Sequence, residues 1–312
     1  MGKSSSVARA CSSALAVLIL LVHAAPAGAA LTDSDKLAAV YESILSAQFD
    51  RADAELKQTC PPAPAEACQT LGVVSLWWRI QLDPDNRGRD LAFNQRARTS
   101  VRAAEAWTKR DARNAEAWFY LAASYAPLVQ WQALRGERIG AARNGNRVRE
   151  ALEEALRLDP AMADAHFGIG IYEYYADVVS AAAKVFRWLL FLPGGDRVKG
   201  LQAIDKTRQS GNLLRGEADY QRYQIDIWYE HKPDEAIAIL RSLDARYPTN
   251  PLFLQRIAET YETYLHDPRA SAAAWQTLID RAARARVYDA ARVTALAEQK
   301  RRAIIARNPQ LF

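Results

Sequence analysis

One stretch decides how this chain folds: Asn114-Ala-Glu-Ala-Trp118-Phe-Tyr-Leu121-Ala122-Ala-Ser-Tyr125. Its apolar residues recur three and four positions apart, which places them on one face of an α-helix. The same period runs through the rest of the chain, in which Gly and Pro account for only 14 and 13 of the 312 residues. No run of alternating Val, Ile and Thr indicates a strand. The sequence therefore predicts an all-α fold.

The spacing W-x2-L-[GA]-x2-Y within this stretch recurs further along the chain. It is carried first by Trp118, Leu121, Ala122 and Tyr125, and again by Leu254, Ile257, Ala258 and Tyr261. A partial copy consists of His166, Ile169 and Gly170, with its Tyr displaced to Tyr172 or Tyr174. A second spacing, A-x3-F-x2-A-x4-P with substitutions, is carried by Ala236, Leu240, Leu243 and Pro248, and in part by Leu152, Ala155 and Pro160.

These two spacings resemble the tetratricopeptide repeat, a helix–turn–helix unit of about 34 residues. The resemblance covers about residues 114–284 and implies an α-solenoid of paired helices. Gly170 takes a position at which a small residue lets two helices approach closely. Two stretches depart from the pattern: about a dozen extra residues within 131–146, and the segment 178–200. The stretch from Gly170 to Leu201 also resembles, more weakly, the divergent tetratricopeptide-repeat-39 group.

The N-terminus has the features of a cleaved signal peptide. Lys3 and Arg9 precede a short apolar run, Ala14 to Val22, which is followed by small residues ending at Ala30. This run is too short to span the roughly 30 Å hydrocarbon core of a bilayer. We therefore expect residues 1–30 to be removed and the mature chain, without a transmembrane segment, to be exported to a bacterial periplasm or the cell exterior.

The mature chain divides into three expected regions. An irregular N-terminal helical region spans 31–110, with helices near 37–45, 52–58, 67–82 and 89–109 and an N-cap within 32–35. The tetratricopeptide-like repeats span 111–286. A capping helix spans 287–312, because a repeat array needs a polar cap over its last unit; its basic side chains leave docking on anionic lipid as the alternative.

Two cysteines remain after removal of the leader, Cys60 and Cys68, on either side of a Pro-rich loop. An even number of cysteines in an exported protein favours a disulfide over two free thiols. A zinc site is disfavoured, because two cysteines without a nearby His provide too few ligands.

The sequence shows no constellation typical of an enzyme. His166, His231 and His266 are far apart, and neither H-E-x-x-H nor G-x-S-x-G occurs. We expect no metal and no cofactor. The formal net charge of +5, which falls when the leader is removed, is too small to indicate nucleic-acid binding.

Two further segments are open to structural and functional interpretations. The Gly194-Gly195-Asp196-Arg197 element is expected to form a turn and an Asp N-cap for a helix ending at Gly211, rather than an anion site. The apolar segment Val178 to Leu192 is expected to be a core helix rather than a membrane contact.

The expected function is non-catalytic binding of a protein or peptide in the concave groove of the solenoid. The repeat register places aromatic and amide side chains on that groove, where rings provide contact area and amides provide direction. These candidate residues are Phe119, Phe167, Tyr174, Gln221, Trp228, Gln255 and Glu259. The alternative for any one of them is packing beneath the irregular segments. A different class of function, a solute- or glycan-binding component of a transport or cell-wall system, remains open, and a closed pocket would favour it.

Overall fold

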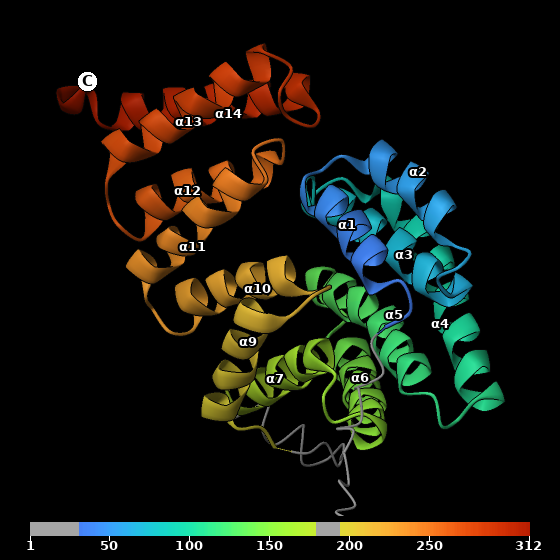
Figure 1. The fold of residues 1–312 in the computed structure, drawn as a ribbon. Helices are drawn as coiled ribbons and strands as arrows, with labels where there is room; N and C mark the ends of the chain where they lie inside the picture. Colours follow the sequence, from blue (N-terminus) through green and yellow to red (C-terminus); the bar gives the residue numbers. More distant parts are fainter. Residues whose placement is uncertain (1–30, 179–193) are drawn as a thin grey trace, which may run out of the picture.

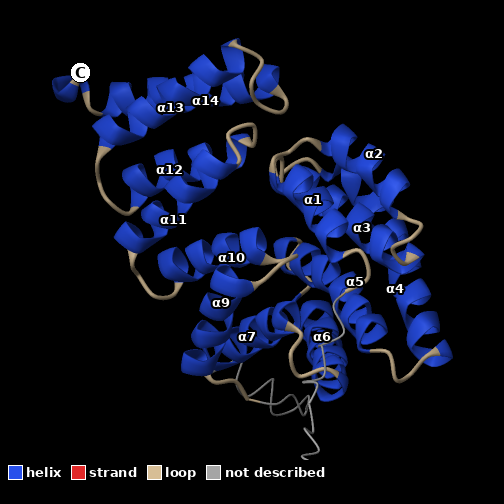
Figure 2. Ribbon diagram, viewed as in Figure 1, coloured by secondary structure: helices blue, strands red, loops and turns tan. Residues whose placement is uncertain are grey.

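The computed structural model describes residues 31–178 and 194–312. In these two ranges the chain forms thirteen α-helices and two short 3-10 helices, with no strand (Figure 2). The expectation of an all-α fold is confirmed. The expected signal peptide, and the expected core helix Val178 to Leu192 apart from Val178 itself, lie outside the described residues.

Four helices form the N-terminal region. They are α1 (Ser34–Leu45), α2 (Phe49–Thr59), α3 (Ala65–Gln81) and α4 (Asp90–Arg110), with the 3-10 helix η1 (Arg87–Arg89) before α4. Each lies within a few residues of its predicted bounds. The N-cap expected within 32–35 is Asp33, which has a left-handed backbone and makes no capping hydrogen bond with its side chain. Its carboxylate pairs with Lys36 at 2.9 Å, and the Thr32 hydroxyl donates to Glu116 on another helix.

The remaining helices pack consecutively along the chain. They are α5 (Ala115–Leu134), α6 (Arg138–Leu158), α7 (Ala163–Val178), α9 (Arg197–Ser210), α10 (Arg215–Trp228), α11 (Pro233–Arg246), α12 (Pro251–Thr263), α13 (Pro268–Ala283), α14 (Ala290–Arg307) and the short η2 (Pro309–Leu311). Figure 1 shows them as stacked antiparallel pairs that curve around one side of the molecule. This is the predicted α-solenoid of helical repeats. Its last helix buries Val293 and Ile304, while Leu296 and Ile305 are half-buried.

The helix starts follow from local chemistry. Asn114, Asn250 and Asp267 each accept a backbone N–H with their side chains at the start of α5, α12 and α13. Such a cap satisfies a donor that has no partner within the helix. Asp196 does the same for α9, accepting from Lys199, and the helix ends before Gly211 as predicted. The extra residues within 131–146 lengthen α5 and α6 into a long hairpin with a turn at Gly136.

Two glycines set the spacing between α7 and α9. A Cβ atom on Gly170 would lie 2.9 Å from the carbonyl oxygen of Gly200, and one on Gly200 would lie 2.7 Å from the carbonyl oxygen of Gly170. Distances this short leave no room for a side chain at either position. The pair therefore explains why Gly occupies the predicted close-approach position 170.

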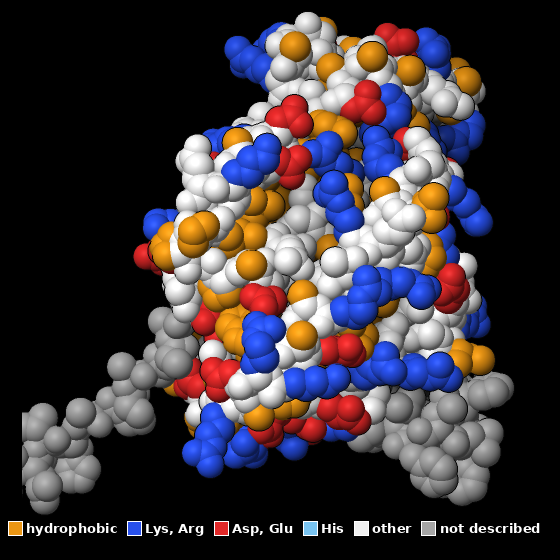
Figure 3. Space-filling view, turned by 90° about the vertical axis from the view of Figure 1, so that its right-hand side faces the viewer, with side chains coloured by type: hydrophobic (Ala, Val, Ile, Leu, Met, Phe, Trp, Pro, Cys, Tyr) orange, Lys and Arg blue, Asp and Glu red, His pale blue; other side chains and the backbone are white. Residues whose placement is uncertain are grey.

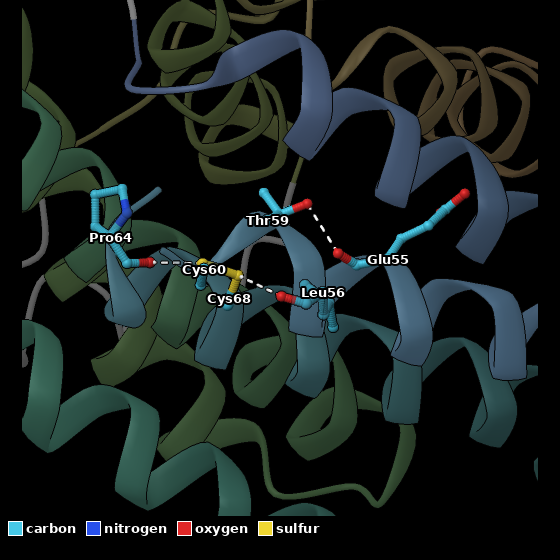
Figure 4. Close-up of a disulfide and its surroundings, with 6 residues drawn as sticks. All are labelled: Glu55, Leu56, Thr59, Cys60, Pro64 and Cys68. Carbon is cyan, nitrogen blue, oxygen red and sulfur yellow. Dashed lines mark hydrogen bonds between the residues drawn. A yellow bond between two sulfur atoms is a disulfide. The ribbon is translucent and has the colours of Figure 1, made fainter. Parts of the chain in front are cut away.

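A disulfide joins Cys60 at the end of α2 to Cys68 in the first turns of α3, as predicted (Figure 4). The Pro-rich loop between them reverses the chain direction. Just before the bridge, the Thr59 hydroxyl donates to the carbonyl oxygen of Glu55 at 2.9 Å, within the last turn of α2. The bridge thus fixes the α2–α3 corner of the N-terminal region.

The N-terminal helices also pack against the middle of the repeat array. Trp78 on α3 contacts the rings of Tyr220 on α10 and Phe253 on α12, with centroid distances of 5.1 and 6.2 Å. The Asn250 side chain donates to the carbonyl oxygen of Leu45 at the end of α1, at 2.7 Å. The chain therefore curves back on itself, and α1 and α3 cover part of the concave side of the array.

Candidate functional site

The concave side of the array contains a cavity of about 1680 Å³, here called the main cavity. Its described walls come from α3, α5, α6, α7 and α10, with Tyr41 of α1 and Arg256 of α12 at its edge. The first helices of three repeat pairs, α5, α7 and α10, thus surround the main cavity together with α3 of the N-terminal region. Curvature of the solenoid produces the space, and α3 bounds it on the side away from the repeats.

Most of the lining is apolar. Small residues on α5 keep the wall open, because Ala123 and Ala126 extend little beyond the backbone. Larger side chains around them include Leu71, Val74, Trp77, Phe119, Val129, Ile139, Val148, Leu152, Phe167, Ile171 and Tyr175. A concave apolar surface of this kind is typical of ligand sites, in which a few polar groups set the orientation of the ligand.

Four hydrogen-bond donors on this lining have no partner among the described residues. They are Trp77 Nε1, Gln81 Nε2, the Tyr120 hydroxyl and Arg256 Nε. Trp77 and Gln81 stand one turn apart on the same face of α3. Trp77 and Tyr120 are almost completely buried. Buried donors are normally paired, because an unpaired one costs about 1–3 kcal/mol. These four atoms have almost no accessible surface, so they lie beneath the surface of the main cavity rather than open to it.

A buried carboxylate, Glu217 on α10, lies where α1 and α10 meet at this cavity. Its Oε2 accepts from the Tyr41 hydroxyl at 2.9 Å and its Oε1 accepts from Gln221 Nε2 at 2.9 Å. Burial raises the pKa of Glu217 above its ordinary value, although these two hydrogen bonds oppose the rise. The cluster ties α1 to α10 beside the main cavity.

A second buried carboxylate, Asp164, stands at the start of α7. It accepts from the backbone N–H groups of Leu213 and Leu214 at 3.1 and 3.0 Å, in the turn that leads into α10. Burial raises the pKa of Asp164, and the backbone donors oppose this rise. Its lone pairs are largely used within the protein, so Asp164 holds the turn in place rather than offering a free acid to the cavity.

A smaller cavity of about 530 Å³, here called the polar pocket, lies between α10, α12 and α14. Trp228 and Arg256 line both the polar pocket and the main cavity, so the two are neighbours. Arg256 Nη1 donates to Glu259 Oε2 at 2.5 Å, which aims the guanidinium group into the polar pocket. The lining here mixes charged, amide and aromatic side chains, unlike that of the main cavity.

The structure separates the seven candidate groove residues into three groups. Phe119, Phe167 and Gln221 line the main cavity, each less than a tenth exposed. Trp228 lines both cavities, and Glu259 lines the polar pocket. Tyr174 and Gln255 line neither cavity among the described residues.

The two residues outside the cavities are both buried. Tyr174 is in a small cluster with Ile204 and Ile225, and its hydroxyl donates to Glu230 at 2.5 Å. The Gln255 side chain has an amide nitrogen without a partner among the described residues. The repeat register places these positions on the inner side of the helix pairs. Neighbouring helices bury some of them, so those residues do not reach a cavity.

Sequence reasoning missed Trp77, Gln81, Tyr120, Glu217 and Arg256. The two residues on α3 carry no repeat signal, because α3 lies outside the recurring spacing. Tyr120 immediately follows Phe119 in the quoted stretch, and the helical period alone does not show that both rings turn inward. Glu217 shares its helix face with Gln221 and Gln224, so the sequence pattern does not single it out.

Within residues 31–178 and 194–312, no His, Cys, Asp and Glu side chains gather in a group of three able to hold a metal ion. In the same part of the chain no helix is both long and apolar enough to cross a membrane. Figure 3 shows the side of the molecule on which α2 and α4 lie, with Lys and Arg side chains spread over it and acidic side chains between them.

No protein-family model matches this chain, and comparison with curated proteins finds no match. The chemistry of the two cavities is therefore the basis for a function.

Proposed function

We propose that this protein is a non-catalytic binding protein whose main cavity holds an extended apolar segment of a partner polypeptide. The observation that carries the proposal is the size of the main cavity together with its largely apolar lining, to which both the N-terminal helices and the repeat helices contribute. An extended polypeptide places side chains at regular intervals along its length, so it can cover a long apolar wall. Its apolar side chains would fill the space between Phe119 and Phe167.

The size of the main cavity supports a chain rather than a small solute. Sites for small molecules usually measure about 300–1,000 Å³, and this cavity measures about 1680 Å³. An elongated ligand can also contact α3 and the repeat helices at the same time. The resemblance to tetratricopeptide repeats agrees with a peptide ligand, and export to a periplasm or the cell exterior would define where the partner occurs.

Selection of peptides from a random display library on the purified natural protein tests the proposal. Ala126 lines the main cavity, so Ala126→Trp should fill part of it and weaken selected peptides by about tenfold or more. Ala106 is exposed on α4 and lines neither cavity, which makes Ala106→Trp the matched control. We expect the control to bind like the natural protein.

Two outcomes would overturn the proposal. One is failure of the library to yield any sequence that binds with a dissociation constant below about 100 μM. The other is equal binding to the Ala126→Trp and Ala106→Trp variants, since peptides would then use a surface outside the main cavity. Thermal melting of both variants separates loss of binding from loss of folding.

A further inference from the structure

The polar pocket has the size of a small-ligand site. Its volume of about 530 Å³ falls within the range of about 300–1,000 Å³ found for such sites. Three helices that are not consecutive, α10, α12 and α14, form its walls. The lining residues are Tyr223, Trp228, Arg256, Glu259, Thr260, Glu262, Thr263, Tyr264, Gln299, Lys300, Ala303 and Arg307.

Two large aromatic rings stand open at this pocket. Trp228 is 48% exposed and Tyr264 is 39% exposed, whereas most aromatic side chains of the chain are buried. The ring of Tyr223 packs beside that of Trp228, with a ring-centroid distance of 6.4 Å. Burial of such rings is normally favourable, so exposed rings at a cavity indicate a surface that a ligand covers.

The polar groups beside these rings are paired in a way that orients them. Arg256 Nη1 bonds Glu259 at 2.5 Å, and Arg307 Nη2 bonds Glu262 at 2.5 Å. Each pair sets planar donors and acceptors side by side on the pocket wall. The exposed Gln299 amide adds one acceptor and two donors. Donors and acceptors placed side by side can hydrogen-bond adjacent hydroxyl groups of a ligand, because each hydroxyl both donates and accepts.

We infer that the polar pocket binds a short saccharide, with the C–H face of a pyranose ring on Trp228 or Tyr264. The hydroxyls would bond the Glu259 and Glu262 carboxylates and the Gln299 amide. A phosphate ligand suits the pocket less well, because Arg256 and Arg307 are already paired with Glu259 and Glu262. An apolar solute would cover these ion pairs and the Gln299 amide without replacing their hydrogen bonds to water, which costs free energy. This site goes beyond the polypeptide-binding role and does not depend on it.

Saturation-transfer NMR with four soluble disaccharides, cellobiose, maltose, lactose and chitobiose, tests the inference. We expect at least one of them to bind the natural protein with a dissociation constant near or below about 1 mM. Gln299→Ala removes an exposed side chain and Trp228→Ala removes the stacking surface. Each should weaken that disaccharide by about tenfold or more. Phe312→Ala, which removes an exposed ring outside the pocket, is the matched control and should bind as tightly as the natural protein.

The Ala126→Trp variant separates this site from the main cavity, because it should retain saccharide binding. Melting curves check that Trp228→Ala is folded, and Gln299→Ala gives an independent result if it is not. Absence of binding to all four disaccharides would overturn the inference. Equal binding to the natural protein and to Gln299→Ala and folded Trp228→Ala would overturn it as well.

Discussion

The Tyr41 hydroxyl on α1 donates a 2.9 Å hydrogen bond to Glu217 on α10, across 176 positions of the sequence. Both side chains are buried. The contact joins the first helix of the N-terminal region to the middle of the repeat array, and both side chains line the main cavity. The N-terminal helices and the repeat array thus pack against each other at this cavity.

Tyr41→Phe is expected to lower the free energy of unfolding by about 1–3 kcal/mol, because it leaves a buried carboxylate oxygen without its donor. Urea unfolding at neutral pH measures the change. Tyr288→Phe is the control, since Tyr288 packs edge-on against Phe49 at 5.0 Å and its hydroxyl makes no hydrogen bond within the described part of the chain. An equal loss in both variants would show that the Tyr41 hydroxyl contributes nothing specific.

Glu217→Gln should change how stability depends on pH. Burial raises the pKa of Glu217 in the folded protein above the value of about 4.3 expected in the unfolded chain. The folded state then binds more protons, so stability falls as pH rises through the window between these two pKa values. Gln does not titrate. The Tm difference between variant and natural protein should therefore shift in favour of the variant from about pH 4 to about pH 7.

The raised pKa values of Asp164 and Glu116 affect both proteins equally and cancel in this comparison. A Tm difference that stays constant over the whole pH range would contradict a raised pKa at Glu217. Differential scanning calorimetry in matched buffers supplies the measurement.

Gly170→Ala is expected to cost about 1–3 kcal/mol of stability through overpacking, because its Cβ would lie 2.9 Å from the Gly200 carbonyl oxygen. Gly72→Ala on α3 is the control, since a Cβ there meets no atom within 4 Å. This second change should stabilise the protein by about 0.5–1 kcal/mol, as expected for Ala in place of Gly within a helix. Similar melting temperatures for the two variants would refute the close contact of α7 and α9.

The Cys60–Cys68 bridge should resist alkylation in protein purified without reductant. Intact mass after treatment with iodoacetamide, without reductant, should show no added label. The two cysteines are eight positions apart, and the entropy of closing so short a loop corresponds to roughly 2–3 kcal/mol. The Cys60→Ala/Cys68→Ala variant should melt at a correspondingly lower temperature. Labelling of both thiols in the purified protein would contradict the bridge.

The parts of the fold that depend on local sequence were predictable. Helical period and capping residues located the helices, and Asp196 and Gly211 marked the ends of α9. The short Cys60–Cys68 spacing also carries its explanation within a few residues. Gly170 was identified from its repeat position, although the atoms that exclude a side chain there belong to α9. The N-cap expected within 32–35 makes no capping hydrogen bond with its side chain: Asp33 pairs with Lys36, and Thr32 bonds Glu116, 84 positions away.

The site was predictable only in part. The repeat register indicates which way a residue points within a helix pair, and Phe119, Phe167 and Gln221 do line the main cavity. The repeat register carries no information on where α1 and α3 pack, because contacts such as that of Trp78 with Phe253 join segments far apart in the sequence. Those contacts determine where the repeat helices border a cavity, whereas Tyr174 is covered by Ile204 of α9 and Ile225 of α10. The resemblance to tetratricopeptide repeats stays a prediction.

The Trp77 indole tests the polypeptide-binding role most directly, because its ring lies on the wall of the main cavity. With the protein labelled with ¹⁵N at tryptophan, the resonance is assigned by its loss in Trp77→Phe and followed during titration with a library-selected peptide. Binding in the cavity predicts a change in the chemical shift of this resonance, because a peptide packed on the wall alters the surroundings of the ring. A bound peptide that leaves the Trp77 resonance unchanged would contradict the proposed role.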